Sequence, residues 1–246
     1  MKVNEHWFSK NLRRDMNIKI YGHGGAPILV FPTQDAMSDN FENFGMVETL
    51  KNFLDGGQIQ LFCVDTVDAE SWSDTWGDKV SRAARQEEYY RYIAEEVAPF
   101  ILTRTKRLPI TTGCSLGATH AAILFFRRPE LFAGMLAMSG VYDAKYFFGG
   151  WSNATLYDNS PTDFLANISP GHEYIKIYNT KKIIFCIGQG RWEDEGLRTT
   201  AILRDIFKAK GISAWVDFWG CDVDHDWPWW KKQIVYFLPY LLGDSK

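Results

Sequence analysis

The feature that most constrains the fold is a glycine-flanked serine between a short apolar run and a helix-forming run. Residues 113–117 read Gly-Cys-Ser-Leu-Gly. Residues 108–112 before them are apolar and β-branched, which is typical of a buried parallel strand, and residues 118–126 after them are rich in Ala, Leu and Phe. A sharp strand-to-helix turn of this kind holds its serine in a strained conformation, and the glycines let strand and helix pass closely. The pattern predicts a nucleophile elbow at Ser115.

The rest of the chain alternates strand-like and helix-like segments. Besides the elbow strand, the apolar patterns predict strands at residues 5–12, 16–22, 27–31, 59–64, 131–139, 181–187 and 212–219. They predict helices at residues 46–54, 80–100, 194–210 and 228–242 in addition to the elbow helix. The first two strands read as an antiparallel edge hairpin. Strands that alternate with helices predict an α/β fold, a mostly parallel sheet with helices on both faces that binds ligands at the carboxyl ends of its strands.

Residues 141–180 interrupt this alternation, because they are rich in aromatic residues, Gly, Asn and Pro without a clear period. We expect them to form an insertion over the active site, within a single domain that spans residues 1–246. Aromatic side chains could line an apolar acyl or aryl pocket there. Trp151 of the insertion and Trp227 of an aromatic cluster near the C-terminus are the candidate substrate-binding residues.

Composition and charge limit the classes of binding partner and the compartment that we expect for this chain. The net charge is −3 with no Lys/Arg run, which argues against nucleic acid or an anionic membrane as a partner. No apolar run approaches a membrane span, and the N-terminal residues lack the apolar segment of a signal peptide. Three of the four widely spaced cysteines lie in or beside apolar runs, which predicts buried reduced thiols and a cytoplasmic protein. The oligomeric state stays open, with a homodimer as one alternative.

An elbow serine needs a histidine to take its proton and a carboxylate to orient that histidine. In a fold with such an elbow the partners follow in the chain order serine, acid, histidine. Of the five histidines, His225 lies after the last predicted strand and before a helix start marked by Asp226 and Pro228. We therefore expect His225 to be the base. His120 lies on the elbow helix, where we expect it to pack against its neighbours.

The acid is expected after the strand at residues 181–187, where Glu193, Asp194 and Glu195 are consecutive. Acidic residues at this position also complement the dipole of the helix that follows. Glu193 is favoured over Asp194, because Asp194 suits the helix N-cap and Glu193 remains in the loop. Asp143, after the preceding strand, is a third candidate.

An oxyanion hole needs two backbone N–H donors that converge on the developing negative charge. One is expected from Leu116, the residue after the nucleophile, and the other from the loop after the strand at residues 27–31. Position in that loop indicates Gln34, since Pro32 has no N–H to donate.

These segments resemble the Putative esterase family of the α/β-hydrolases, which includes esterase D (S-formylglutathione hydrolase), feruloyl esterases, enterochelin esterases and mycolyltransferases. The resemblance is carried by residues 14–16, 31–33, 113–118, 188–194 and 225–230. It implies a three-layer sandwich with an eight-stranded sheet and a short insertion after the sixth strand. It also implies Ser115 as nucleophile, His225 as base, an acid at Glu193 or Asp194, and donors at Gln34 and Leu116. No metal or organic cofactor is implied, and the chain lacks the longer insertions of esterase D, which counts against formylglutathione as substrate.

The sequence therefore predicts a serine carboxylic-ester hydrolase that acts on a small acyl or aryl ester through an acyl-enzyme. The same residues would serve an acyltransferase in which an alcohol acceptor replaces water. A binding module of the same fold without activity is a third hypothesis, which the intact elbow, base and acid region disfavour.

Overall fold

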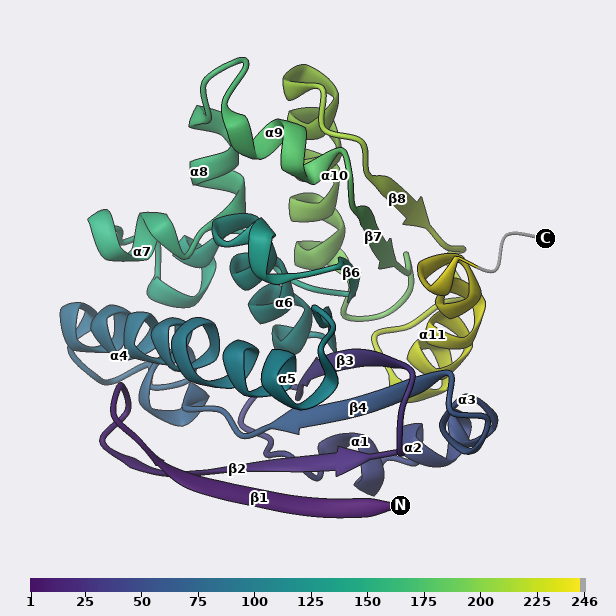
Figure 1. Cartoon of the computed structure of the whole chain (residues 1–246). Coiled ribbons are helices and arrows are strands. Elements are labelled where there is room, and N and C mark those ends of the chain that lie inside the picture. Colours follow the sequence, from purple (N-terminus) through teal and green to yellow (C-terminus); the bar gives the residue numbers. More distant parts are fainter. Residues whose placement is uncertain (244–246) are drawn as a thin grey trace.

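The computed structural model describes residues 1–243, and an eight-stranded sheet forms its centre (Figure 1). The strand order is β1-β2-β4-β3-β5-β6-β7-β8. The strands are β1 (Lys2–Ser9), β2 (Arg14–Tyr21), β3 (Ala26–Phe31), β4 (Ile59–Val64), β5 (Ile110–Cys114), β6 (Gly134–Met138), β7 (Lys182–Ile187) and β8 (Trp215–Phe218). β2 pairs antiparallel with β1 and with β4, and the other neighbours are parallel. The predicted mostly parallel α/β sheet is confirmed.

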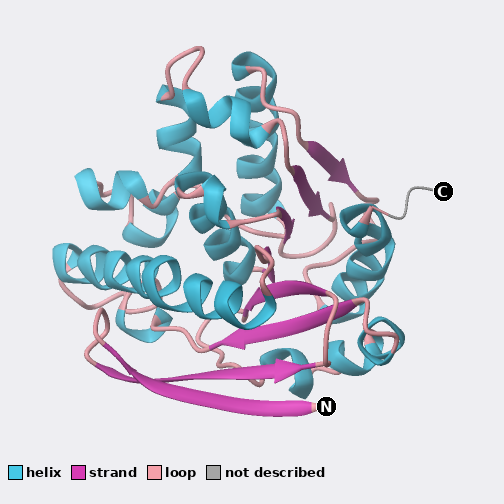
Figure 2. Cartoon of the chain, viewed as in Figure 1, coloured by secondary structure: helices cyan, strands magenta, loops and turns pink. Residues whose placement is uncertain are grey.

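Helices cover both faces of the sheet (Figure 2). The helices are α1 (Asn40–Asn43), α2 (Met46–Thr49), α3 (Lys51–Asp55), α4 (Lys79–Tyr92), α5 (Ala98–Thr105), α6 (Leu116–Arg127), α7 (Ala154–Asp158), α8 (Pro161–Asn167), α9 (Glu173–Tyr178), α10 (Asp194–Lys210) and α11 (Trp227–Leu242). Side chains of α4, α5, α6 and α10 form one apolar cluster with the sheet, and those of α2, α3 and α11 form a second on the opposite face. The molecule is thus a three-layer sandwich with two cores.

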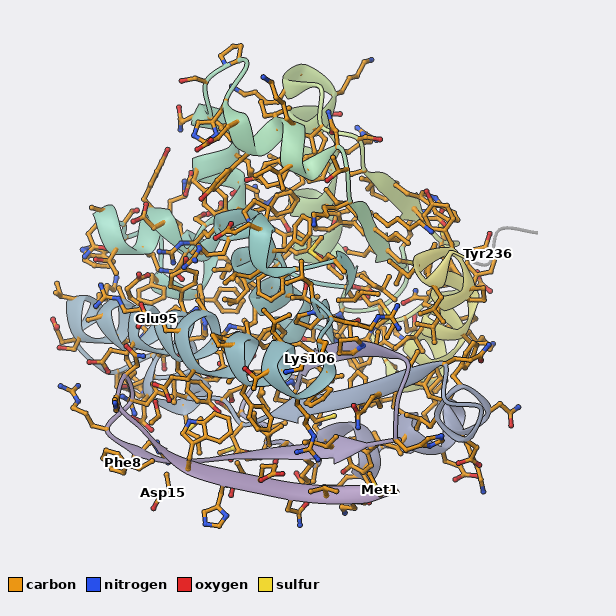
Figure 3. The ribbon with its side chains drawn as sticks, in the orientation of Figure 1. Met1, Phe8, Asp15, Glu95, Lys106 and Tyr236 are labelled. Atoms are coloured by element: carbon orange, nitrogen blue, oxygen red, sulfur yellow. The ribbon has the colours of Figure 1, made fainter. Side chains whose placement is uncertain are left out.

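The β1–β2 hairpin lies at one edge of the sheet, as expected. Ile18 and Ile20 are fully buried, whereas Phe8 is 60% exposed. Figure 3 shows the labelled side chains of Phe8 and Asp15 near the turn of this hairpin, where the two residues face each other across the strands. The first strand begins earlier than predicted and ends at Ser9, because the chain turns there and buries Leu12 in the core.

Several predicted boundaries differ for identifiable reasons. The long helix at residues 80–100 is α4 and α5 joined by a π-helical turn, η2 (Ile93–Val97). Pro99 in the first turn of α5 has no N–H to donate, so the regular hydrogen-bond ladder cannot continue through it. The helix at residues 46–54 is interrupted at Leu50, which separates α2 from α3.

The segment at residues 141–180 is more regular than its sequence indicates. It contains the short 3-10 helix η4 (Ala144–Phe148) and the helices α7, α8 and α9. Each is only one or two turns long, so no apolar period can develop in the sequence. Among residues 1–243, none of the helices has the length and apolar character needed to cross a membrane.

Candidate active site

Ser115 lies in a strained turn between β5 and α6. Its backbone angles are φ 56° and ψ −128°, a conformation that side-chain-bearing residues rarely adopt. A Cβ atom on Gly113 would lie 2.4 Å from the carbonyl carbon of Gly117, and one on Gly117 would lie 2.4 Å from the carbonyl oxygen of Phe31. Both glycines are therefore needed for the close passage of β5, α6 and the end of β3, as the elbow pattern predicts.

His225 lies between Ser115 and Glu193. Its Nε2 atom is 2.9 Å from Oγ of Ser115, and its Nδ1 atom is 2.9 Å from Oε2 of Glu193. The ring is further fixed by Trp230, which packs edge-to-face with a centroid separation of 4.9 Å. Three side chains from the loops after β5, β7 and β8 thus form one hydrogen-bonded line, although they are far apart in the sequence.

Backbone and side-chain contacts hold the loops after β7 and β8 together. The guanidinium of Arg191 donates two hydrogen bonds, of 3.0 and 2.8 Å, to Oδ2 of Asp224. The N–H of His225 donates to the carbonyl oxygen of Arg191 at 3.0 Å. The N–H and the side chain of Arg191 hold the pKa of Asp224 below its ordinary value. This pairing sets His225 against the loop that carries Glu193.

Of the candidate acids, only Glu193 faces His225 among the described residues. Its side chain is 1% exposed, and Oε1 accepts a 2.6 Å hydrogen bond from Oγ of Ser139. Glu193 occupies the N-cap position of α10 but makes no capping hydrogen bond, because its carboxylate turns inward. Asp194, expected at the N-cap, is the first residue of α10 and is exposed to solvent.

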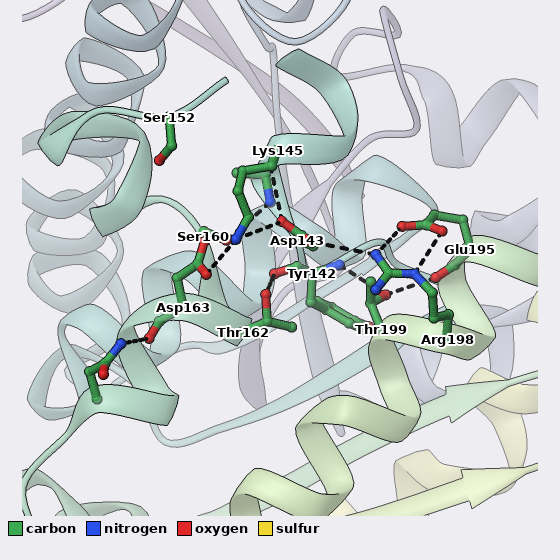
Figure 4. Close-up of polar contacts among 12 residues, drawn as sticks. Tyr142, Asp143, Lys145, Ser152, Ser160, Thr162, Asp163, Glu195, Arg198 and Thr199 are labelled. Carbon is green, nitrogen blue, oxygen red and sulfur yellow. Dashed lines mark hydrogen bonds and ion pairs between the residues drawn. The ribbon is translucent and has the colours of Figure 1, made fainter. Parts of the chain in front are cut away.

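Asp143 lies in a different set of contacts (Figure 4). It is 3.4 Å from Arg198 and 3.9 Å from Lys145, and Lys145 also pairs with Asp163 at 2.7 Å. Arg198 in turn pairs with Glu195 at 2.5 Å. These alternating charges link the segment at residues 141–180 to the first turns of α10. Asp143 therefore fixes this segment against the core.

Leu116 and Gln34 line the same pocket as Ser115 and His225. Leu116 is the first residue of α6, so its N–H has no partner within the helix. Gln34 lies in the loop after β3, and its side chain donates a 2.9 Å hydrogen bond to Oγ of Ser73. The two residues expected to supply oxyanion donors thus both border the pocket at Ser115.

The pocket over Ser115 has a volume of about 160 Å³. Tyr146 and Phe147 from η4 and Trp192 from the loop after β7 supply its aromatic walls, and Glu195 adds a carboxylate. Sequence pattern alone does not single out Trp192 as a pocket residue, although its position next to Glu193, in a loop after a strand, is a signal that points to the site. Trp192 is 76% exposed and has a left-handed φ of 64°.

Trp151 and Trp227, expected as substrate-binding residues, lie outside the lining of this pocket. Trp151 stacks on Phe148 with a centroid separation of 6.0 Å, and Trp227 is 8% exposed between Phe41 and Phe44. Both are held by large apolar neighbours, so they contribute to packing.

The cysteine next to Ser115 is buried in an environment that disfavours its thiolate. Burial raises the pKa of the Cys114 thiol well above its ordinary value, and Cys63 and Cys186 are also buried. Cys221 is exposed. Within residues 1–243, no group of three or more His, Cys, Asp or Glu side chains is arranged to hold a metal ion.

Comparison with known proteins identifies the family. The model of the Putative esterase family matches residues 9–241. The chain belongs to this family. As a member it is a carboxylic-ester hydrolase, and its mostly parallel sheet with helices is the α/β-hydrolase fold of esterases.

Solved structures, among them an esterase and a hydrolase, share the fold at low identity. A ferulic acid esterase superposes with a TM-score of 0.75 at 12% identity, covering 100% of this chain and 98% of the other. An S-formylglutathione hydrolase from Agrobacterium tumefaciens gives 0.77 at 15% identity, with 99% and 95% coverage. MPT51 (FbpC1) from Mycobacterium tuberculosis gives 0.72 at 13%, with 100% and 99% coverage. No curated protein matches the chain.

Proposed function

We propose that this family member hydrolyses small carboxylic esters through an acyl-enzyme formed on Ser115. The observation that carries the proposal is the line from Oγ of Ser115 through both nitrogens of His225 to Glu193, with 2.9 Å at each step. A hydroxyl, an imidazole and a buried carboxylate in this order form the arrangement that activates serine nucleophiles.

In the proposed reaction His225 takes the hydroxyl proton as Oγ of Ser115 attacks the ester carbonyl carbon. The negative carbonyl oxygen accepts hydrogen bonds from the N–H groups of Leu116 and Gln34. The tetrahedral intermediate collapses, the C–O bond to the alcohol breaks, and His225 returns the proton to the leaving oxygen. Water then attacks the acyl-enzyme with His225 as base, which releases the acid and restores Ser115. Glu193 holds the imidazole and stabilises its charged form.

The pocket supports a small acyl or aryl group as the substrate class. Its volume of about 160 Å³ is well below the roughly 300–1,000 Å³ of sites that enclose drug-sized ligands. Tyr146, Phe147 and Trp192 offer aromatic surfaces to an acyl chain or a ring. We further propose a reducing, cytoplasmic location, which the four free thiols, including the exposed Cys221, support.

The direct test is labelling by a fluorophosphonate together with hydrolysis of p-nitrophenyl acetate. The wild type should take up one label per chain and release p-nitrophenol, and Ser115→Ala should lose both. Ser152→Ala, at an exposed serine of the segment at residues 141–180, is the matched control and should retain both. A wild type that neither labels nor hydrolyses would refute the proposal. Added alcohol that captures most of the acyl group would identify an acyltransferase instead.

A further inference from the structure

A second histidine–carboxylate pair, this one fully buried, lies beside the elbow and has no part in the reaction above. His120 of α6 is fully buried, and its Nε2 atom is 2.9 Å from Oδ1 of Asp68, whose side chain is also fully buried. Asp68 belongs to the short 3-10 helix η1 (Asp68–Glu70), in the connection after β4. Rings of Phe31 and Tyr89 enclose the histidine, with centroid separations of 5.9 and 5.0 Å. Burying such polar groups costs free energy unless they form hydrogen bonds with a partner.

The other oxygen of Asp68 faces the loop that carries Gln34. Oδ2 accepts a hydrogen bond from the N–H of Asp35 at 3.4 Å. The carbonyl oxygen of Asp68 accepts the N–H of Ser73 at 2.9 Å, and Oγ of Ser73 accepts the side-chain amide of Gln34 at 2.9 Å. Asp68 therefore holds Gln34 and Asp35 from two directions.

Asp35 needs such support because of its backbone. Its φ is 58°, in the left-handed region that costs a residue with a side chain about 1 kcal/mol or more. Strain of this kind persists only where surrounding contacts hold it. The hydrogen bond from its N–H to Asp68 fixes the peptide that joins it to Gln34, and hence the orientation of the Gln34 backbone.

We propose that Asp68 is a positioning residue for the oxyanion hole, anchored by His120 to the helix that supplies the other donor. This inference rests on the proposed function. Both donors are then anchored to α6. Leu116 is the first residue of this helix, and the loop of Gln34 is connected to the helix through Asp68 and His120. Misplacement of a reacting group by about 1 Å can lower a rate ~100-fold, so such a connection has a catalytic consequence.

The test variant is Asp68→Asn. When the amide oxygen of the new Asn faces His120, the hydrogen bond to Nε2 of His120 is kept. The NH₂ group of the Asn then faces the N–H of Asp35, which loses its acceptor. The opposite rotamer would require a proton on Nδ1 of His120, a buried atom with no hydrogen-bond partner among the described residues. We expect kcat for p-nitrophenyl acetate to fall about 10–100-fold with KM within ~2-fold, since a displaced donor costs less than the ~10²–10³-fold of a deleted one.

Asp65→Asn is the matched control. Asp65 is a buried carboxylate from the same connection after β4, and it accepts the N–H of Ser38 at 2.9 Å at the far end of the same loop. Its kcat per labelled site should change less than ~3-fold, because the Gln34 end stays fixed. Sites are counted by fluorophosphonate titration, so that a smaller folded fraction does not lower the apparent kcat.

The inhibition constant Ki of a trifluoromethyl ketone distinguishes a positioning role of Asp68 from a role in stability alone, because loss of stability would not change Ki per folded site. The adduct of this ketone with a serine places an oxyanion in the hole, so its Ki should weaken in Asp68→Asn by the same factor as kcat/KM. Unchanged kcat and Ki, or an equal loss in Asp65→Asn, would overturn the inference. If Asp68→Asn does not fold, Ser73→Ala releases the Gln34 side chain, and an unchanged kcat and Ki there would overturn it too. A wild type without labelling or hydrolysis would instead refute the proposed function.

Discussion

Oγ of Ser139 lies 2.6 Å from Oε1 of Glu193, so that only Oε2 of this carboxylate is left to face His225. Ser139 follows β6 directly and has a left-handed φ of 57°. The indole N–H of Trp230 donates to the same Oγ at 3.0 Å, so the hydroxyl proton is directed at Glu193. Strand β6 and helix α11 together thus fix the carboxylate that orients the proposed base.

Removal of this hydroxyl should impair the reaction more than the fold. In Ser139→Ala, Glu193 loses a charge-assisted hydrogen bond, and we expect kcat to fall about 10-fold. Trp230→Phe removes the indole N–H but leaves the serine in place, and should have a smaller effect. Steady-state kinetics with a thermal unfolding curve for each variant checks this. Equal kcat in Ser139→Ala and the wild type would show that Glu193 is held without Ser139.

Neutralising Glu193 should lower kcat strongly, whereas neutralising the adjacent Asp194 should leave kcat almost unchanged. Glu193→Gln presents an amide to His225 and is expected to lower kcat by roughly 10³-fold, because the imidazolium loses its countercharge and the favoured tautomer is disturbed. Asp194→Asn alters an exposed residue at the start of α10 and should change kcat less than about 2-fold. Comparison of kcat for p-nitrophenyl acetate decides the matter, and the reverse order of effects would assign the acid to Asp194.

The size of the pocket predicts a preference for short acyl chains. We expect kcat/KM for p-nitrophenyl acetate or butyrate to exceed that for the octanoate by at least ~10-fold, since extra methylenes must find room. Phe147→Ala opens one wall and should shift this ratio toward the octanoate. Trp151→Ala removes an aromatic ring outside the lining and should leave the ratio as it is. A shift with Trp151→Ala alone would place the acyl chain elsewhere.

Glu96 should make stability depend on pH. Burial opposes its ionisation, but hydrogen bonds from Trp7, Asn11 and Ser9 outweigh it and hold the pKa of its carboxyl below the ordinary 4.5. A lowered folded-state pKa favours the charged form, so this stabilisation is fully present above pH 4.5 and is lost as the pH falls through the lower folded-state value.

The matching measurement compares the wild type with Glu96→Gln. At pH 7 the variant should melt about 3–6 °C lower, from the loss of hydrogen bonds to a charged group. As the pH falls below 4.5 the two melting temperatures should approach each other, because the wild-type carboxylate becomes protonated. A constant difference in Tm from pH 7 to pH 3 would contradict the assignment.

The fold and two members of the proposed catalytic line, Ser115 and His225, could be predicted because their signals are local. An apolar run followed by Gly-Cys-Ser-Leu-Gly specifies a tight turn whatever surrounds it, and the contacts of Gly117 with the end of β3 explain the requirement. His225 could be found because few histidines exist and one of them follows the last strand. Buried strands and the inner side of α4 are likewise visible as apolar periods.

The acid and the pocket depended on contacts between distant segments. Three consecutive carboxylates offer similar chemistry, and only the folded structure shows that Glu193 turns inward to Ser139 and His225 while Asp194 starts a helix. Aromatic residues are equally suited to cores and pockets, so Trp151 could not be separated from Trp192 without the packing around each. The sequence by itself therefore determined the fold class and indicated the proposed nucleophile and base, Ser115 and His225, since backbone geometry and chain order specify them. The tertiary structure decided which carboxylate faces His225, the pocket walls and the contacts of Asp68 with the loop that carries Gln34, because side-chain direction depends on neighbours far along the chain.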